Sequence, residues 1–200
     1  MQRPTPRERR QAAARRALAE QALRLFAERG YEATTVAEIA DAADMSPRTF
    51  FRHVRDKDDA MFAADEDAFG EVLEAAVPAG ADAAPLARLL HGVRALAASA
   101  GRDGDVKCAR ERVLEENPAL RARDLAQQLR WQQRAEEFLR ADGVPAGEAA
   151  LAAGLALTVW REAYRRWIAA GGDPGALAGL LDDVTAELPA HVRALGARRG

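Results

Sequence analysis

The sequence has little of several residue types that define common protein classes. It contains one cysteine, Cys108, and aromatic side chains make up only 6% of it. A single cysteine excludes an internal disulfide, and we expect a reducing, cytoplasmic compartment. No apolar run reaches the length of a signal segment or a membrane span, so we expect no membrane partner. β-Branched residues are sparse while Ala, Leu, Arg and Glu abound, which favours an all-helical protein.

The residues that enzymes and metal sites require are few and scattered. The three histidines, His53, His91 and His191, lie in separate regions without metal-ligand spacing, so we expect no metal site. No glycine-rich phosphate loop follows a strand, and no nucleophile signature surrounds Cys108. We therefore expect no catalytic residue and no cofactor, and the chain is not expected to be an enzyme.

Charge is distributed unevenly along the chain, although the formal net charge is only −2. Residues 1–57 hold twelve basic and eight acidic residues, whereas the remaining residues hold seventeen basic and twenty-three acidic ones. A basic first segment joined to an acidic remainder is typical of a protein that contacts phosphate at one end only.

The segment from Thr35 to Lys57 predicts two short helices separated by a tight turn. Thr35 and Glu38 form a capping box, in which the hydroxyl and the carboxylate each accept from a backbone amide at the helix start. The second helix opens at Ser46, with Pro47 at the first helical position. A helix this short is unstable alone, so we expect neighbouring elements to hold it as a rigid exposed rod, as reading of the major groove requires.

Residues 14–62 resemble the DNA-binding head of the TetR family of repressors. The resemblance implies an all-α fold of about nine helices, with a three-helix helix-turn-helix head in residues 1–76 (the helix-turn-helix at about 35–54). Residues 77–200 would form a helical ligand-binding and dimerisation bundle. The residues that carry the resemblance are Ala22, Leu25, Phe26, Gly30, Tyr31, Thr34, Thr35, Val36, Ile39, Ala40, Ala43, Ser46, Thr49, Phe50, Phe51, His53 and Lys57.

Base reading is expected from the exposed face of the helix that Ser46 opens. Arg48 and Arg52 can each bind a guanine through two hydrogen bonds, and Thr49 can present its methyl group to thymine. A solvated surface is the alternative for these arginines and for Lys57. The resemblance implies backbone contacts from several further positions. The predicted DNA-contacting residues are Thr35, Ser46, Pro47, Arg48, Thr49, Phe51, Arg52, His53 and Lys57.

Three residues depart from the family pattern. Phe51 stands where the family usually has Tyr, Val54 replaces a usual Phe, and Asp44 replaces the usual turn glycine. Asp tolerates a left-handed backbone better than most residues, so the turn is expected to form. Phe51, Asp44 and the mild charge of the head support a rival interpretation, a helical small-molecule carrier or protein-interaction module whose head has lost DNA binding.

A long fourth helix is predicted from about Asp56 to Ala76, with the acidic residues 65–67 facing water. An effector bound in the body would tilt this helix and change the spacing of two heads. Pro189 is expected to interrupt the last helix, because proline removes a donor and clashes with the preceding turn.

The apolar stripes of the last two helices are predicted to pair with their copies in a second subunit. The predicted interface residues are Leu157, Trp160, Tyr164, Trp167, Leu177, Leu181, Val184 and Leu188; the alternative is that they face only their own core. The expected partners are a near-palindromic operator in double-stranded DNA, a second copy of the chain and an unidentified small-molecule effector. The candidate effector-binding residues are His91, Arg112, Trp131, Phe138, Trp160 and Tyr164, for which core packing or surface exposure is the alternative. The expected function is a transcriptional repressor that the effector releases from its operator.

Overall fold

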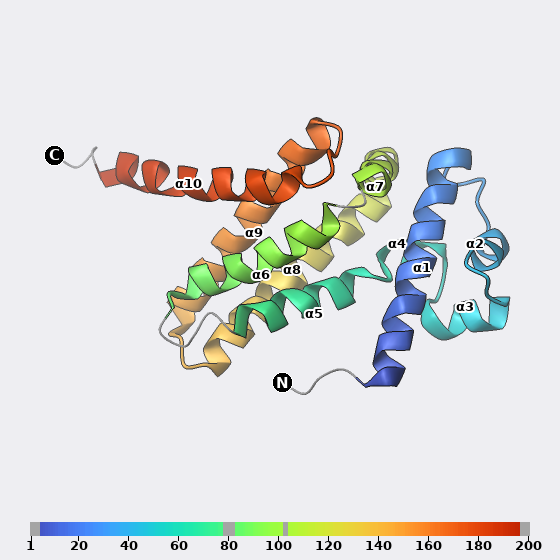
Figure 1. Cartoon of the computed structure of the whole chain (residues 1–200), viewed down its shortest axis with the longest axis horizontal. Helices are drawn as coiled ribbons and strands as arrows, with labels where there is room; N and C mark the ends of the chain where they lie inside the picture. Colours follow the sequence, from blue (N-terminus) through green and yellow to red (C-terminus); the bar gives the residue numbers. More distant parts are fainter. Residues whose placement is uncertain (1–4, 78–82, 102–103, 197–200) are drawn as a thin grey trace. The chain divides into compact units, whose positions relative to one another are not determined.

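The computed structural model describes residues 5–77, 83–101 and 104–196, and side chains as far as Ala190. Within these ranges all regular secondary structure is helical, which confirms the predicted all-α class (Figure 1). The described helices are α1 (Pro6–Arg29), α2 (Val36–Ala42), α3 (Pro47–His53), α4 (Lys57–Phe62), α5 (Asp65–Ala76), α6 (Pro85–Ala100), α7 (Gly104–Glu116), α8 (Pro118–Ala141), α9 (Ala146–Ala169) and α10 (Ala176–Gly196).

These helices form two compact units. The first comprises residues 1–74 and 105–127, and the second comprises residues 75–104 and 128–200. The sequence-based boundary between residues 76 and 77 was placed at a segment containing proline and glycine, residues 77–84, of which 78–82 lie outside the described residues. Packing assigns most of α7 and the first part of α8 to the same unit as α1–α4. The assignment of DNA binding and effector binding to separate domains stays a prediction.

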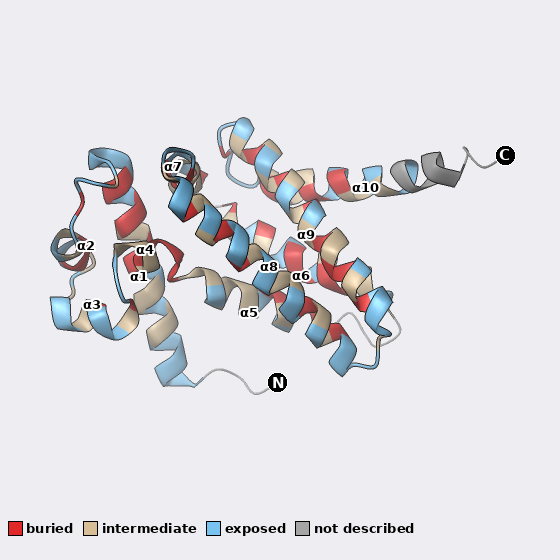
Figure 2. Ribbon diagram, turned by 180° about the vertical axis from the view of Figure 1, so that it is seen from behind, coloured by how far each residue is buried: buried red, intermediate tan, exposed pale blue. Residues whose placement is uncertain are grey.

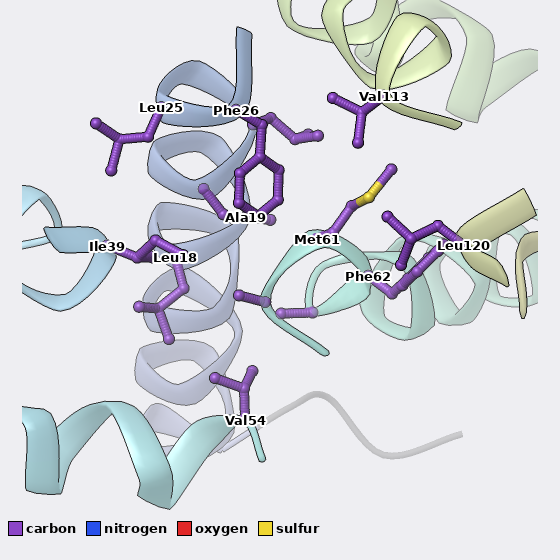
Figure 3. Packing of buried hydrophobic residues seen from close by; sticks show 14 of the residues in the cluster. Leu18, Ala19, Leu25, Phe26, Ile39, Val54, Met61, Phe62, Val113 and Leu120 are labelled. Carbon is purple, nitrogen blue, oxygen red and sulfur yellow. The ribbon is translucent and has the colours of Figure 1, made fainter. Parts of the chain in front are cut away.

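The first unit is built on one apolar cluster. Leu18 of α1, Ile39 of α2 and Phe50 of α3 are fully buried in it. Val113 and Leu120, from α7 and α8, belong to the same cluster (Figure 3). Burial of such side chains contributes about 1.5–3 kcal/mol each relative to exposure, which is how a seven-residue helix becomes stable here.

The predicted continuous helix from Asp56 to Ala76 is wrong, because α4 ends at Phe62 and α5 begins at Asp65. The Ala63 amide donates to the Ala60 carbonyl at 3.2 Å, a tightened bond of the kind that ends a helix. Met61 and Phe62 are buried in the core of the first unit. The described residues form ten helices where about nine were predicted, and residues 56–76 do not form one continuous helix.

The expectation that residues 65–67 face water is wrong for two of the three. Asp67 accepts two hydrogen bonds from Arg15, at 2.6 and 2.8 Å. Asp65 accepts from Arg110 at 3.2 Å, and Arg110 also donates to the buried Asp124 at 2.6 Å. Burial raises the pKa of Asp65, with the carboxylate of Asp124 acting in the same direction and the charge of Arg110 opposing it. The acidic stretch thus lies within a charged network of the first unit.

The second unit packs α6, α9 and α10 together. Figure 2 shows buried and exposed positions alternating along α9, as expected for an amphipathic helix. Trp167 is fully buried and its indole N–H donates to the Asp173 carbonyl at 2.9 Å. The predicted interruption at Pro189 is wrong, because α10 continues through it to Gly196. Pro189 removes one backbone donor from α10. The earlier turns of the helix are stabilised by the buried side chains of Leu177 and Leu181.

Candidate functional site

Capping side chains fix the start of both helices in the helix-turn-helix. The Glu38 amide donates to the Thr35 hydroxyl at 3.3 Å, and the Glu38 carboxylate accepts from the Thr35 amide at 2.8 Å, so the predicted capping box is confirmed. The Thr49 amide donates to the Ser46 hydroxyl at 3.2 Å, with Pro47 at the first helical position, as predicted. Each cap stabilises its helix by about 1 kcal/mol. These bonds hold the ends of α2 and α3 in place.

Asp44 makes the turn between these helices. Its φ of 54° is positive, the conformation that the usual glycine would adopt without cost. The turn is closed by the Met45 amide, which donates to the Ala40 carbonyl at 2.8 Å. The prediction that the turn survives with Asp at this position is therefore confirmed.

Helix α3 has one buried anchor and an exposed outer face. Phe50 is fully buried, and its ring meets that of Phe51 edge to face at 5.3 Å. Phe51 itself is 58% exposed, which is unusual for a large apolar side chain. Arg48 and Arg52 are exposed, one helical turn apart, and neither forms an ion pair with the described residues. Helix α3 thus carries two cations and an apolar ring that its own unit leaves uncovered.

Lys57 is tied to its own chain. Its ammonium donates to the Tyr31 carbonyl at 2.9 Å and lies 4.0 Å from the centre of the Tyr31 ring. A weaker bond reaches the Thr34 carbonyl at 3.5 Å. These contacts fasten α4 to the chain that follows α1, so Lys57 has a structural role that the sequence did not reveal. Its contact with phosphate stays a prediction.

His53 lies half-buried at the end of α3. Its pKa is lowered, first by burial and then by the positive charges of Arg52 and Arg15. The imidazole is therefore neutral at neutral pH, and a nearby phosphate would favour its protonated form.

The candidate effector residues do not share one environment. His91 and Arg112 are exposed, and Arg112 belongs to the first unit. Trp131, in α8, and Phe138 are half-buried in the second unit. Trp160 and Tyr164 stack with ring centres 5.6 Å apart on α9. The structure therefore joins only the last pair, and the roles of all six in ligand binding stay predictions.

The predicted dimer interface divides into two sets. Four of its residues are buried in the chain's own core, so they have no surface to offer a second copy and the prediction is wrong for them. This set is Trp167, Leu177, Leu181 and Val184, none more than 6% exposed. The remaining four, Leu157, Trp160, Tyr164 and Leu188, are half-buried. Leu151, which the sequence reasoning missed, is 64% exposed on α9.

The burial of two arginines was not predicted from the sequence. Arg110 is 8% exposed and Arg88 is 4% exposed. Each has a buried residue four positions later on its helix, Leu114 after Arg110 and Gly92 after Arg88. Positions three or four apart share a helix face, so an arginine in line with an apolar stripe was the available signal. Across residues 5–77, 83–101 and 104–196, no helix is long and apolar enough to span a bilayer, and no group of three or more His, Cys, Asp or Glu side chains could hold a metal ion.

Comparison with known proteins supports the geometry of α2 and α3. Residues 12–64 match the family described as "Bacterial regulatory proteins, tetR family". The HTH-type transcriptional regulator TcmR of Streptomyces glaucescens is 37% identical over 128 residues, which are 60% of this chain and 55% of TcmR. The chain thus spans about half the length of the curated relative it matches.

Solved structures extend the similarity beyond the head. Thermus thermophilus FadR, a TetR-family transcriptional repressor solved with lauroyl-CoA, superposes with a TM-score of 0.56 at 25% identity, covering 87% of this chain and 92% of FadR. The fatty acid degradation regulator FadR of Bacillus halodurans gives a TM-score of 0.55 over 94% of this chain and 96% of its own, and at 15% identity it supports the fold alone. Together with the capped α2 and α3 and the left-handed turn between them, these matches show that residues 12–64 are similar to the helix-turn-helix head of TetR-family regulators and that the chain resembles such regulators over most of its length.

Proposed function

We propose that this protein is a sequence-specific DNA-binding transcriptional regulator, a repressor released from its operator by a small molecule. The observation that carries the proposal is the outer face of α3. Arg48, Phe51 and Arg52 are exposed there, on a helix whose position is fixed by the buried Phe50 and the Ser46 cap. A short helix with a fixed backbone and free cationic side chains is what reading the major groove requires.

The side chains of α3 would make different kinds of contact with DNA. Each arginine can donate two parallel hydrogen bonds to the O6 and N7 of one guanine, which discriminates against other bases by about 1–3 kcal/mol. Phe51 has no hydroxyl for a phosphate, so its ring would pack against sugar or a thymine methyl. Backbone affinity would then come from the amides and hydroxyls at the helix starts and from the arginines of the basic head.

Operator binding would need two copies of the chain. A homodimer places two α3 helices about 34–36 Å apart, one turn of DNA, and so fits a near-palindromic site. The support for a dimer is an apolar face of α9 that the single chain covers only in part: Leu157, Trp160 and Tyr164 are spaced three and four residues apart and are half-buried. Replacing Leu157 with Asp should shift the sedimentation coefficient to that of the single chain, and an unchanged coefficient would contradict this interface. The protein would act in the cytoplasm, at the nucleoid when DNA is bound.

The experiment that tests DNA recognition is selection of binding sites from random duplex DNA, followed by a salt titration on the selected site. We expect a near-palindrome, and a fall in log K with log salt of about 0.9 per phosphate neutralised. Arg48→Ala should relax the preference at one base position in each half-site. Arg130→Ala, an exposed arginine in the second unit, is the matched control and should leave both affinity and preference unchanged. Failure to enrich any sequence would favour the rival carrier or interaction module.

The effector is the second part of the proposal. Since Thermus thermophilus FadR was solved with lauroyl-CoA, that thioester is the first compound to test for release of the selected DNA. The signal would not pass along one rigid rod, because the chain between α4 and α5 turns at Ala63 and Ala64. The ligand would have to bind the DNA-free state more tightly, and by linkage DNA would weaken ligand binding by the same factor.

A further inference from the structure

Arg88 is a buried cation with fewer hydrogen bonds than its chemistry demands. The residue lies on α6, in the second unit, and is 4% exposed. Its guanidinium carries five N–H donors, yet one hydrogen bond is found for it among the described residues, from Nη2 to the carboxylate of Asp142. The Nε atom is buried, and no residue of the described ranges offers it a hydrogen-bond acceptor. A group in this state calls for an explanation, because an unsatisfied buried donor is costly and rare.

Among the described residues, the carboxylate that pairs with Arg88 is about half exposed to solvent. Asp142 follows the end of α8, in the turn that Gly143 completes with a φ of 87°. Its side chain is 48% exposed, whereas the Arg88 side chain is 5% exposed. Water can therefore hydrogen-bond to the Asp142 carboxylate in place of Arg88, whereas the buried guanidinium is shielded from solvent. The pair is unequal, and Asp142 is the partner that can leave.

An aromatic ring completes this environment. The Arg88 guanidinium lies 5.2 Å from the centre of the Phe138 ring, one turn before Asp142 on α8. A guanidinium over an aromatic face keeps its edge free for in-plane donation to a carboxylate or phosphate. The arrangement offers cationic donors for an anion beside an apolar surface for the rest of a ligand.

We propose that Arg88 is the anion-recognising residue of the effector site, and that the effector is an amphipathic organic anion whose carboxylate or phosphate replaces Asp142. The proposal rests on the proposed function, since it specifies the effector of the same regulator. Asp142 occupies the position of the ligand's anion in the free protein. The ligand's oxygens accept from Arg88 Nη2 and Nε, and its apolar part packs against the Phe138 side of α8. Release of Asp142 then frees the turn between α8 and α9.

This exchange predicts opposite effects for the two members of one ion pair. Asp142→Asn removes the competing charge, so anions should bind more tightly than to the wild-type chain. Arg88→Met removes the donors and should weaken anion binding about tenfold or more, the range expected for hydrogen bonds to a charged group. A purely structural ion pair would instead weaken ligand binding and stability in both variants.

The test uses the full chain with octanoate, octyl phosphate and octan-1-ol as probes, and isothermal titration calorimetry as the readout. We expect saturable binding of one or both anions, no saturable binding of the neutral alcohol, and tighter anion binding by Asp142→Asn. The preferred anion identifies the carboxylate or phosphate chemistry. Arg94→Met and Asp182→Asn are the matched controls, because this pair also begins on α6 but both side chains are 52% exposed; each should bind as the wild-type chain does.

Several outcomes would overturn the proposal: equal binding of the alcohol, no saturable anion binding by either the wild-type or the Asp142→Asn chain, or the same sign of change in both variants. If Arg88→Met fails to fold, the anion affinity of Asp142→Asn still tests the proposal, because this side chain is half exposed. Binding of the selected DNA by the same preparations separates the two proposals. Intact DNA binding without the opposite effects rejects this inference alone, whereas loss of sequence-specific DNA binding in the wild-type chain rejects the proposed function.

Discussion

Replacing Arg110 with Met tests whether a buried charged network holds α7 and α8 onto the core of the first unit. Arg110 donates to Asp124 at 2.6 Å and to Asp65 at 3.2 Å. Its guanidinium also lies 5.2 Å from the centre of the Phe62 ring, which Arg123 approaches at 5.1 Å. Met keeps an unbranched apolar stem of similar reach, so the substitution removes the charge and donors with little change of volume.

The loss of folding stability in Arg110→Met comes from the two carboxylates that Arg110 no longer neutralises. Asp65 and Asp124 would stay buried without the cation, and breaking a buried pair by removing one partner costs about 3–5 kcal/mol. Burial already raises the pKa of Asp65, so loss of Arg110 should raise it further. The folded variant would then hold a proton that the unfolded chain releases. Its free energy of unfolding should therefore fall as pH rises from the ordinary Asp pKa, about 3.9, through the raised folded value.

Hydrogen exchange measured by mass spectrometry resolves the unit that is affected. Peptides from residues 5–74 and 105–127 should lose protection, whereas tryptophan fluorescence reports only the second unit, because Trp131, Trp160 and Trp167 all belong to it. Adding Asp65→Asn and Asp124→Asn to the Arg110→Met chain should recover part of the loss, since no like charges then remain.

Arg16→Met provides the control within the same unit. Its ion pair with Glu71 has side chains 58% and 54% exposed, so its loss should cost at most about 1 kcal/mol. The reasoning fails if Arg110→Met is no more destabilising than Arg16→Met, or if its stability does not depend on pH.

Four further predictions concern the helix-turn-helix. Arg48→Ala should cost about 1–3 kcal/mol of operator affinity and relax one base position, and equal weakening on all sequences would make Arg48 a backbone contact. Phe51→Tyr should tighten binding to every sequence by about 1 kcal/mol, by restoring a hydroxyl for phosphate, and leave urea unfolding unchanged because the ring is 58% exposed; tighter binding to one sequence only would contradict this. Asp44→Gly should raise the free energy of unfolding by about 1 kcal/mol, since φ is 54°, and a lower midpoint in urea would refute the strain. The lowered pKa of His53 keeps its ring neutral in the free protein, and contact with a DNA phosphate would favour the protonated ring. Fluorescence anisotropy should then show tighter DNA binding as pH falls from about 8 to about 6. His53→Gln should remove this pH dependence, and an unchanged dependence would exclude the contact.

Local structure in the head was predictable because its signals are short-range. Thr35 with Glu38, and Ser46 with Pro47, satisfy backbone groups within three or four residues of themselves. The left-handed Asp44 could be placed because the turn needs one such residue between two capped helices. The exposed face of α3 followed from the same spacing.

The errors arose where a residue's environment is made by distant parts of the chain. Asp65 reads as a solvated helix residue, but Arg110, forty-five positions later, makes it an internal ion. The interface stripe on α10 reads correctly as apolar, yet periodicity alone does not say which partner covers it, and α6 and α9 cover Leu177 and Leu181 within the same chain. Lys57 similarly meets Tyr31 only after the chain has folded back.

The sequence by itself determined the helical class, the two capped helices, the turn and the resemblance of residues 14–62 to the TetR head, since each depends on spacing within one or two helical turns. Only the tertiary structure decided that the fourth helix ends at Phe62, that α7 and the start of α8 pack with the head, and that Arg88 and Arg110 are buried. The physical reason is that burial and ion pairing depend on which helix faces reach one another. Those contacts are long-range: a local pattern, such as an arginine in line with an apolar stripe, can indicate burial but does not identify the partner.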